Sequence, residues 1–196
     1  EELYDLQNDP HELVNLAITP THQKNLATMR KVLYQRMIET RDVGLIPEPI
    51  LEDVGREAGN KYLAFLDNDH SGQTRRLIDV ITAGEVNDGA KLLEYTKSPD
   101  PSTRYWAAVW LGVNKTADSK ATLLKLTADP VPAIRVVAAQ ALCKLGDLSQ
   151  LKRLIDHIND PNLLVGMFAL RVIEELGDAG KVHRADIAAA QNSKYE

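Results

Sequence analysis

The sequence has few of the residues that build disulfides, metal sites or nucleic-acid surfaces. Its single cysteine, Cys143, excludes a disulfide within the chain. None of the five histidines has a second histidine or a cysteine at metal-ligand spacing. The net charge is -5, and the scattered basic residues form no stripe that would neutralise a phosphate backbone. We therefore expect no nucleic-acid partner and no resident metal.

Long apolar runs and aromatic residues are also scarce. No apolar stretch approaches the ~20 residues that a helix needs to cross a bilayer, so we expect no membrane segment. Aromatic residues make up 5% of the chain, whereas leucine and alanine are abundant, and this balance favours helices over β-sheets. With 196 residues, the chain is long enough to bury a core. The composition therefore predicts a mainly α-helical fold.

An internal repeat with a period of 31 residues is the strongest pattern in the sequence. Each unit reads as a short helix, a break at proline, and a second helix with alanine at its closest contact. Such a helix pair buries both faces only by stacking on neighbours, so the pattern predicts an α-solenoid of about three helix pairs. The aligned positions are Leu92, Leu123 and Leu154; Pro99, Pro130 and Pro161; Ala107, Ala138 and Ala169; and Leu111, Leu142 and Ile173.

The repeats resemble HEAT repeats, in the short bacterial form whose pattern runs Asp-Pro, then Arg, Ala-Ala and Leu-Gly. The second unit matches this pattern at every element, while the first lacks the aspartate and the third lacks the arginine. The matching residues of the second unit are Asp129-Pro130, Arg135, Ala138-Ala139 and Leu145-Gly146.

The resemblance implies a ladder of hydrogen-bonded ion pairs along the stack. In HEAT arrays the aspartate and arginine of adjacent repeats form such a ladder. Here Arg104 would meet Asp129, and Arg135 would meet Asp160. The acid missing from the first unit and the arginine missing from the last would have no partner, so we expect the array to end at three repeats.

Three large aromatic residues, Tyr105, Trp106 and Trp110, cluster on the second helix of the first repeat. Two interpretations are open. They form a surface on which a sugar stacks or the missing catalytic domain of a longer chain docks, or they pack at the end of the solenoid against the preceding module. Packing is the simpler interpretation.

Residues 2–17 resemble the C-terminal signature of type I sulfatases, which is Leu-Tyr-Asp-Leu, Asp-Pro, Glu and Asn-Leu at fixed spacing. The helix that follows and the 39–48 run also resemble the end of bacterial sulfatases similar to heparan N-sulfatase. The resemblance implies a strand at residues 3–6 that adds to a sheet. The matching residues are Leu3, Tyr4, Asp5, Leu6, Asp9, Pro10, Glu12, Asn15 and Leu16.

This resemblance also implies properties of a longer parent chain, which we expect because the sequence opens on Glu1 without an initiator methionine. The parent would be a periplasmic or extracellular sulfatase that uses formylglycine and a divalent cation such as calcium. The formylglycine motif Cys/Ser-x-Pro-x-Arg is absent, since the run from Cys143 to Asp147 lacks both the proline and the arginine. We therefore assign no catalytic residue, cofactor site or metal site here, and interpret Cys143 as a core residue.

Two hypotheses about function follow. In the first, the chain is the non-catalytic C-terminal part of a sulfatase, and its repeats brace the missing catalytic domain or shape the access of a sulfated glycan. The alternative is an independent HEAT-repeat module that binds protein through its grooved face.

The predicted organisation has four parts. Between the two modules we expect short helices at 61–66 and 74–81, separated by a turn at 67–72. The parts are the end of a sulfatase C-terminal subdomain at 1–50, with a helix from about Pro20 to Thr40; connecting helices at 51–87; HEAT-type repeats at 88–178; and a capping helix and tail at 179–196.

Overall fold

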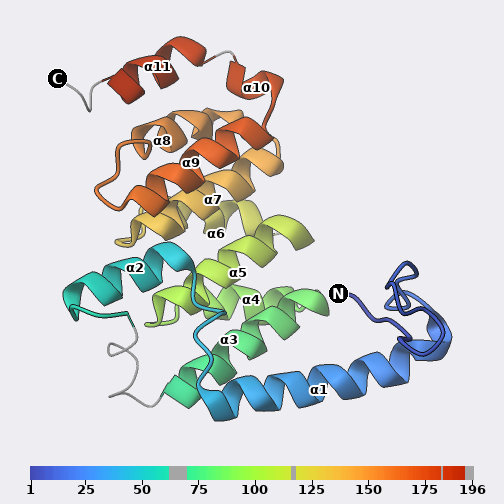
Figure 1. The fold of residues 1–196 in the computed structure, drawn as a ribbon. Helices are drawn as coiled ribbons and strands as arrows, with labels where there is room; N and C mark the ends of the chain where they lie inside the picture. Colours follow the sequence, from blue (N-terminus) through green and yellow to red (C-terminus); the bar gives the residue numbers. More distant parts are fainter. Residues whose placement is uncertain (62–69, 116–117, 182, 193–196) are drawn as a thin grey trace. The chain divides into compact units, whose positions relative to one another are not determined.

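The computed structural model describes residues 1–61, 70–115, 118–181 and 183–192 (Figure 1). Over these residues every regular element is a helix, so the mainly α-helical prediction is confirmed. The chain divides into two compact units, 1–42 and 43–196. Most of the helix predicted at 61–66 and the first half of the turn predicted at 67–72 lie outside the described residues, and residues 70–72 begin a helix rather than a turn.

The first unit consists of an extended N-terminal segment, a 3-10 turn at Pro20–His22 and helix α1, Gln23–Thr40. The helix starts three residues later than the Thr19-Pro20 pair suggested, because Thr19 makes no side-chain capping bond and the first turn is 3-10. Leu26 is the only buried residue of α1. Most of the apolar side chains of this helix therefore face solvent within the unit.

The strand predicted at residues 3–6 is wrong, since the described residues contain no strand. The Leu3 amide donates to Asn15 Oδ1 at 3.1 Å, and the Leu16 amide donates to the Leu3 carbonyl at 2.8 Å. The Asp5 carboxylate accepts from the Gln7 amide at 3.1 Å and turns the chain. Because Asn and Asp side chains take backbone donors here, no ladder of backbone hydrogen bonds can form.

Over its described residues the second unit contains three stacked helix pairs, with α2 and α3 before the stack and α10 and α11 after it. The pairs are α4 with α5, α6 with α7, and α8 with α9, in the order and spacing that the 31-residue period predicts (Figure 1). The helices are α2 Glu48–Glu57, α3 His70–Glu85, α4 Gly89–Tyr95, α5 Pro101–Asn114, α6 Ser119–Leu126, α7 Pro132–Lys144, the 3-10 turn Leu148–Gln150, α8 Leu151–Asp156, α9 Leu163–Glu175, α10 Asp178–Lys181 and α11 Arg184–Asn192.

The helix ends of the repeats follow from local chemistry. Asp100 caps α5 through the Thr103 amide, and Pro101 occupies the first turn, where its missing N–H costs nothing. Gly146 and Gly177 follow the helices α7 and α9 with φ of 89° and 56°. A left-handed residue ends a helix most easily when it is glycine, which explains why the Leu-Gly pair recurs.

The aligned apolar positions form the core. Leu92, Leu111, Leu123, Leu142 and Leu154 are all fully buried, as are the three aligned alanines. The small residues let neighbouring helices approach closely: a Cβ atom added to Gly112 of α5 would lie 2.6 Å from the Cβ of Ala141 in α7. The repeat period therefore marks the residues at which α5, α7 and α9 meet.

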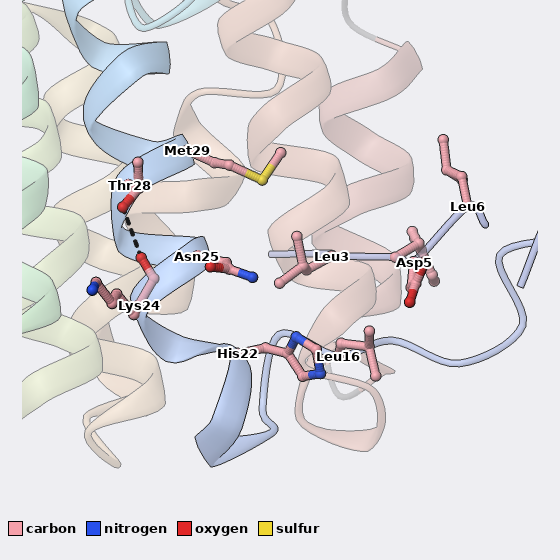
Figure 2. Close-up of a pocket in the computed structure, with 10 residues that line it drawn as sticks. Leu3, Asp5, Leu6, Leu16, His22, Lys24, Asn25, Thr28 and Met29 are labelled. Atoms are coloured by element: carbon pink, nitrogen blue, oxygen red, sulfur yellow. Dashed lines mark hydrogen bonds between the residues drawn. The ribbon is translucent and has the colours of Figure 1, made fainter. Parts of the chain in front are cut away.

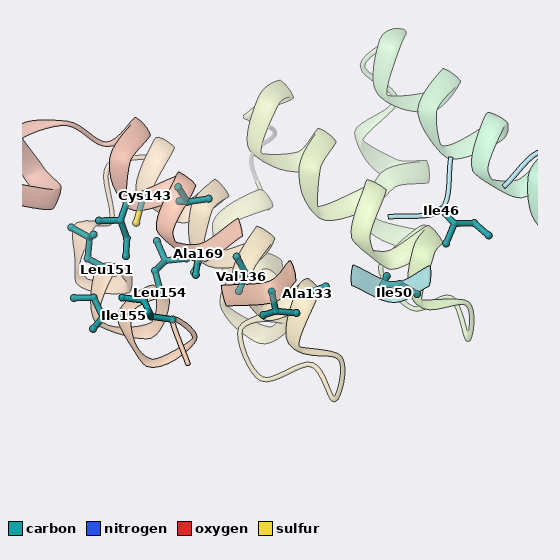
Figure 3. Close-up of a cluster of buried hydrophobic side chains, with 14 of the residues drawn as sticks. Ile46, Ile50, Ala133, Val136, Cys143, Leu151, Leu154, Ile155 and Ala169 are labelled. Carbon is teal, nitrogen blue, oxygen red and sulfur yellow. The ribbon is translucent and has the colours of Figure 1, made fainter. Parts of the chain in front are cut away.

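The segment 43–57, which we call the strap, belongs to the second unit. It comprises a turn and helix α2, and it buries Ile46 and Ile50 in the same apolar cluster as Ala133 and Val136 of α7 (Figure 3). Because the strap packs on the repeats, the boundary between the two units lies between residues 42 and 43, whereas we expected it after residue 50.

Candidate protein-binding face

The first predicted ladder pair is present as a buried, two-point ion pair. Arg104 Nε lies 2.9 Å from Asp129 Oδ2, and Arg104 Nη2 donates to Asp129 Oδ1 at 3.0 Å. The same guanidinium donates through Nη1 to the carbonyls of Ser98 and Pro99. The side chains of Arg104 and Asp129 are 13% and 5% exposed. The pair therefore ties the loop before α5 to the loop before α7.

The second predicted pair does not meet directly. Arg135 repeats the carbonyl contacts of Arg104, donating through Nη1 to the Asp129 and Pro130 carbonyls. Its Nε, however, donates to His157 Nε2 at 3.2 Å, and His157 Nδ1 lies 3.3 Å from an Asp160 carboxylate oxygen. The histidine ring fills the space between the two charges, so it relays the contact between the second and third repeats.

His157 should make stability depend on pH. Burial and the neighbouring Arg135 charge lower the pKa of His157 below its ordinary value of 6.5, although the hydrogen bond to Asp160 opposes this. The unfolded chain then binds the proton more readily than the folded chain, so the contribution is present above pH 6.5 and is lost as pH falls through the lowered pKa.

We expect the free energy of unfolding to fall as pH is lowered from about 7 to about 5, and His157→Gln to reduce this slope. A glutamine still offers Arg135 an oxygen acceptor but does not titrate. Urea denaturation of both proteins across this range measures the effect. His183→Gln is a matched control, because His183 lies on the surface near Asp186. An unchanged slope in His157→Gln would contradict the assignment.

The aromatic residues proposed as one docking surface face different neighbours. Trp106 donates through Nε1 to the Leu45 carbonyl of the strap at 2.7 Å. Trp110 lies against Gly84 of α3, where an added Cβ would come within 2.1 Å of its ring. Tyr105 stands edge-on to Trp106, with ring centroids 5.9 Å apart. Trp106 and Trp110 therefore act in packing, and Tyr105 alone of the three lies on the face described next.

Side chains of the three second helices meet in one small apolar gap beside the strap. We call it the second-helix face, and it is built from α5, α7 and α9, with Pro49 of the strap at its edge. One polar side chain, that of Gln140, is among those that line it. Of its side chains, Tyr105, Gln140 and Phe168 are partly exposed and form the rim that a partner helix would contact, while the others are buried beneath them. Its lining residues are Tyr105, Ala133, Val136, Val137, Gln140, Val165, Phe168 and Val172.

The first unit has a cavity of its own, of about 430 Å³, between its N-terminal segment and α1 (Figure 2). Its lining mixes apolar side chains such as Leu3 and Met29 with polar ones such as His22 and Lys24. A hydrogen bond from Asn8 lowers the pKa of Asp5, which also lines the cavity. These residues lie at the surface, and none is a buried polar group directed into the cavity.

The described residues offer few groups suited to metal binding or nucleophilic catalysis. They include no group of three or more His, Cys, Asp or Glu side chains that would hold a metal ion. Cys143 is buried, and burial raises the pKa of its thiol to about 11, which keeps the thiol protonated. Within the same residues, no helix has both the length and the apolar character required for crossing a bilayer.

Comparison with known proteins identifies the repeat region. Residues 89–167 match the family of HEAT repeats. A stretch of 91 residues is 34% identical to the phycocyanobilin lyase subunit alpha of Picosynechococcus sp., and it covers 42% of this chain and 34% of that protein. The chain thus spans about a third of the length of this relative. No solved structure matches the chain.

These findings overturn the resemblance to type I sulfatases. They relate the chain to HEAT repeats and to a lyase subunit, and neither indicates a sulfatase C-terminal region. The nine matching positions between Leu3 and Leu16 instead form the turns of the first unit. The periplasmic or extracellular location, the formylglycine and the divalent cation rested on that resemblance and lose their support with it.

Proposed function

We propose that the chain is a non-catalytic HEAT-repeat module that binds another protein through the second-helix face. HEAT repeats generally mediate protein interactions, and residues 89–167 match them. The observation that carries the proposal is the rim of this face, where Tyr105, Gln140 and Phe168 are partly exposed above buried apolar side chains of α7 and α9. Aromatic side chains are enriched among the residues that contribute most to the affinity of protein interfaces.

The similarity to a phycocyanobilin lyase subunit does not extend this proposal. The aligned stretch covers about a third of that protein, and we do not assign its activity to this chain. The net charge of -5 favours a protein over a nucleic acid as the partner.

A crosslinking experiment tests the proposal. A photoreactive residue at Phe168, on the face, should capture a protein in the native cells, whereas the same residue at the exposed Leu124 of α6 should not. With the captured protein in hand, Phe168→Asp should weaken binding by about tenfold or more, because a charge would have to be buried in the interface. Leu124→Asp should leave the affinity unchanged, and an equal loss in both variants would contradict the assignment of the face.

A further inference from the structure

The strap occupies one end of the proposed binding face. Helix α2 contacts α9 and crosses the N-terminal ends of α5 and α7. The side chains of Ile46 and Ile50 are 7% and 4% exposed, and both join the cluster formed by the second helices (Figure 3). The strap thus sits as a short amphipathic helix on the repeats, which is the geometry of a bound helical peptide.

Asn162 holds the strap by a hydrogen bond that the other repeats are not built to make. Its Nδ2 donates to the Pro49 carbonyl at 2.8 Å, while its Oδ1 accepts from the Leu164 amide at 3.1 Å and caps α9. The equivalent positions of the first two repeats are Asp100 and Val131, and neither side chain has a donor. The third repeat therefore carries a residue that both caps its own helix and binds the strap.

Acidic side chains of α2 lie near the N-terminal ends of α5 and α7. Asp53, Arg56 and Glu57 line a cleft of about 290 Å³ together with Pro101 and Pro132, the first residues of α5 and α7. Arg56 Nη2 donates to Asp53 Oδ1 at 2.8 Å. The N-terminal end of a helix carries partial positive charge, which attracts carboxylates. With four carboxylates and one guanidinium, α2 keeps a net negative charge beside these ends, and this is the charge that they favour.

The strap is embedded less deeply than the helices beneath it. Three of the ten residues of α2 are buried, namely Pro49, Ile50 and Gly55. By contrast, nine of the thirteen residues of α7 are buried. Elements with few buried contacts open locally at lower free energy than the global unfolding of the protein. The strap can accordingly leave the face while α5, α7 and α9 stay folded.

We propose that the second-helix face is a site for one acidic amphipathic helix, and that α2 occupies it in cis until a partner protein displaces it with a helix of the same kind. This proposal rests on the proposed function, since it names the partner's chemistry. The recognised helix carries an apolar side chain at the place of Ile50 and a free carbonyl at the place of Pro49. A closed site lowers the partner's apparent affinity by the fraction of molecules that are open.

The experiment uses a fluorescent peptide of residues 43–58 added to the full chain. Wild type should bind it weakly, because α2 already occupies the site. Ile50→Glu, which disrupts α2 and leaves the face intact, should bind it about tenfold or more tightly. Adding Asn162→Asp should remove this gain, since aspartate preserves the cap of α9 but cannot donate to Pro49. Val113→Glu, at an exposed site on α5, is the control and should behave like wild type.

Each other outcome overturns the proposal. A folded Ile50→Glu chain, judged by circular dichroism, that binds the peptide no more tightly than wild type overturns the closure of the face by α2. If Ile50→Glu does not fold, hydrogen exchange on wild type decides: the amides of 48–57 should exchange faster than those of α7, and exchange of both at the same rate overturns the idea.

The two proposals fail separately. A native partner that is lost on Phe168→Asp but binds wild type and Ile50→Glu equally well would keep the binding face and overturn its closure by α2. A native partner that ignores Phe168→Asp would overturn the face as the functional site, while the peptide result would still report whether α2 is displaceable.

Discussion

Replacing Asp129 with alanine is expected to lower the free energy of unfolding by about 3–5 kcal/mol. The change leaves the guanidinium of Arg104, 13% exposed, without the carboxylate that both Nε and Nη2 contact. It also removes the acceptor for the Val131 amide at 2.9 Å, at the start of the turn into α7. A buried charge without its counter-charge retains the cost of leaving water, so the loss should exceed that of a surface ion pair.

Chemical denaturation of wild type and Asp129→Ala measures this loss. Asp118→Ala is the matched control, because Asp118 is exposed and makes no side-chain capping bond at the start of α6. Changing Arg104 to methionine in the Asp129→Ala background should recover part of the stability, since the unpaired charge is then absent. A loss of less than about 1 kcal/mol in the single variant would mean that the pair behaves as a surface ion pair.

Leu142→Ala should cost about 2–5 kcal/mol. Leu142 is fully buried on α7, in the cluster that also holds Leu111 and Leu123 from the flanking helices. Removing its isobutyl group leaves a cavity between helices that cannot collapse without separating the repeats. The surrounding alanines are too small to move into the space.

The control for this prediction is Leu148→Ala, because Leu148 is a leucine of the same unit that is 47% exposed. Its loss should stay under about 1 kcal/mol. Thermal and urea unfolding of both variants provide the comparison. Similar losses in the two would show that burial in this region does not determine stability as the packing indicates.

The repeats were predictable because their core residues recur. Leucine and alanine at an offset of 31 mark the positions where helices meet, and the structure buries those positions. The strand at residues 3–6 was not predictable in this way, since four residues carry no period. There, the side chains of Asp5 and Asn15 determine the local structure, and a family-like spacing of residues proved misleading.

The relay through His157 had a signal in the sequence. The equivalent positions of the other repeats hold Leu126 and Tyr95, so a histidine at this place departs from the period. A histidine three residues before Asp160 is also placed to contact its carboxylate. The ladder positions alone do not include this histidine, which enters from the neighbouring turn.

The strap had no such signal. Asn162 and Pro49 lie 113 residues apart, and nothing in the pattern of either segment points to the other. Pro47 and Pro49 do not by themselves predict a helix, yet Pro49 lies in the first turn of α2, where a missing N–H is tolerated. Contacts of this kind depend on tertiary packing, which local sequence rules do not contain.

The close approach at Gly112 means that the repeats are not interchangeable parts. At the first interface Gly112 lies against Ala141. The positions one repeat later hold Cys143 and Val172, which both lie in the apolar cluster that also contains Ile50 of the strap. Each interface is thus matched in size to one neighbour. A duplicated or permuted repeat would bring a bulky residue to a place that accepts only glycine, so the array cannot be lengthened by copying a unit without also resizing the junction.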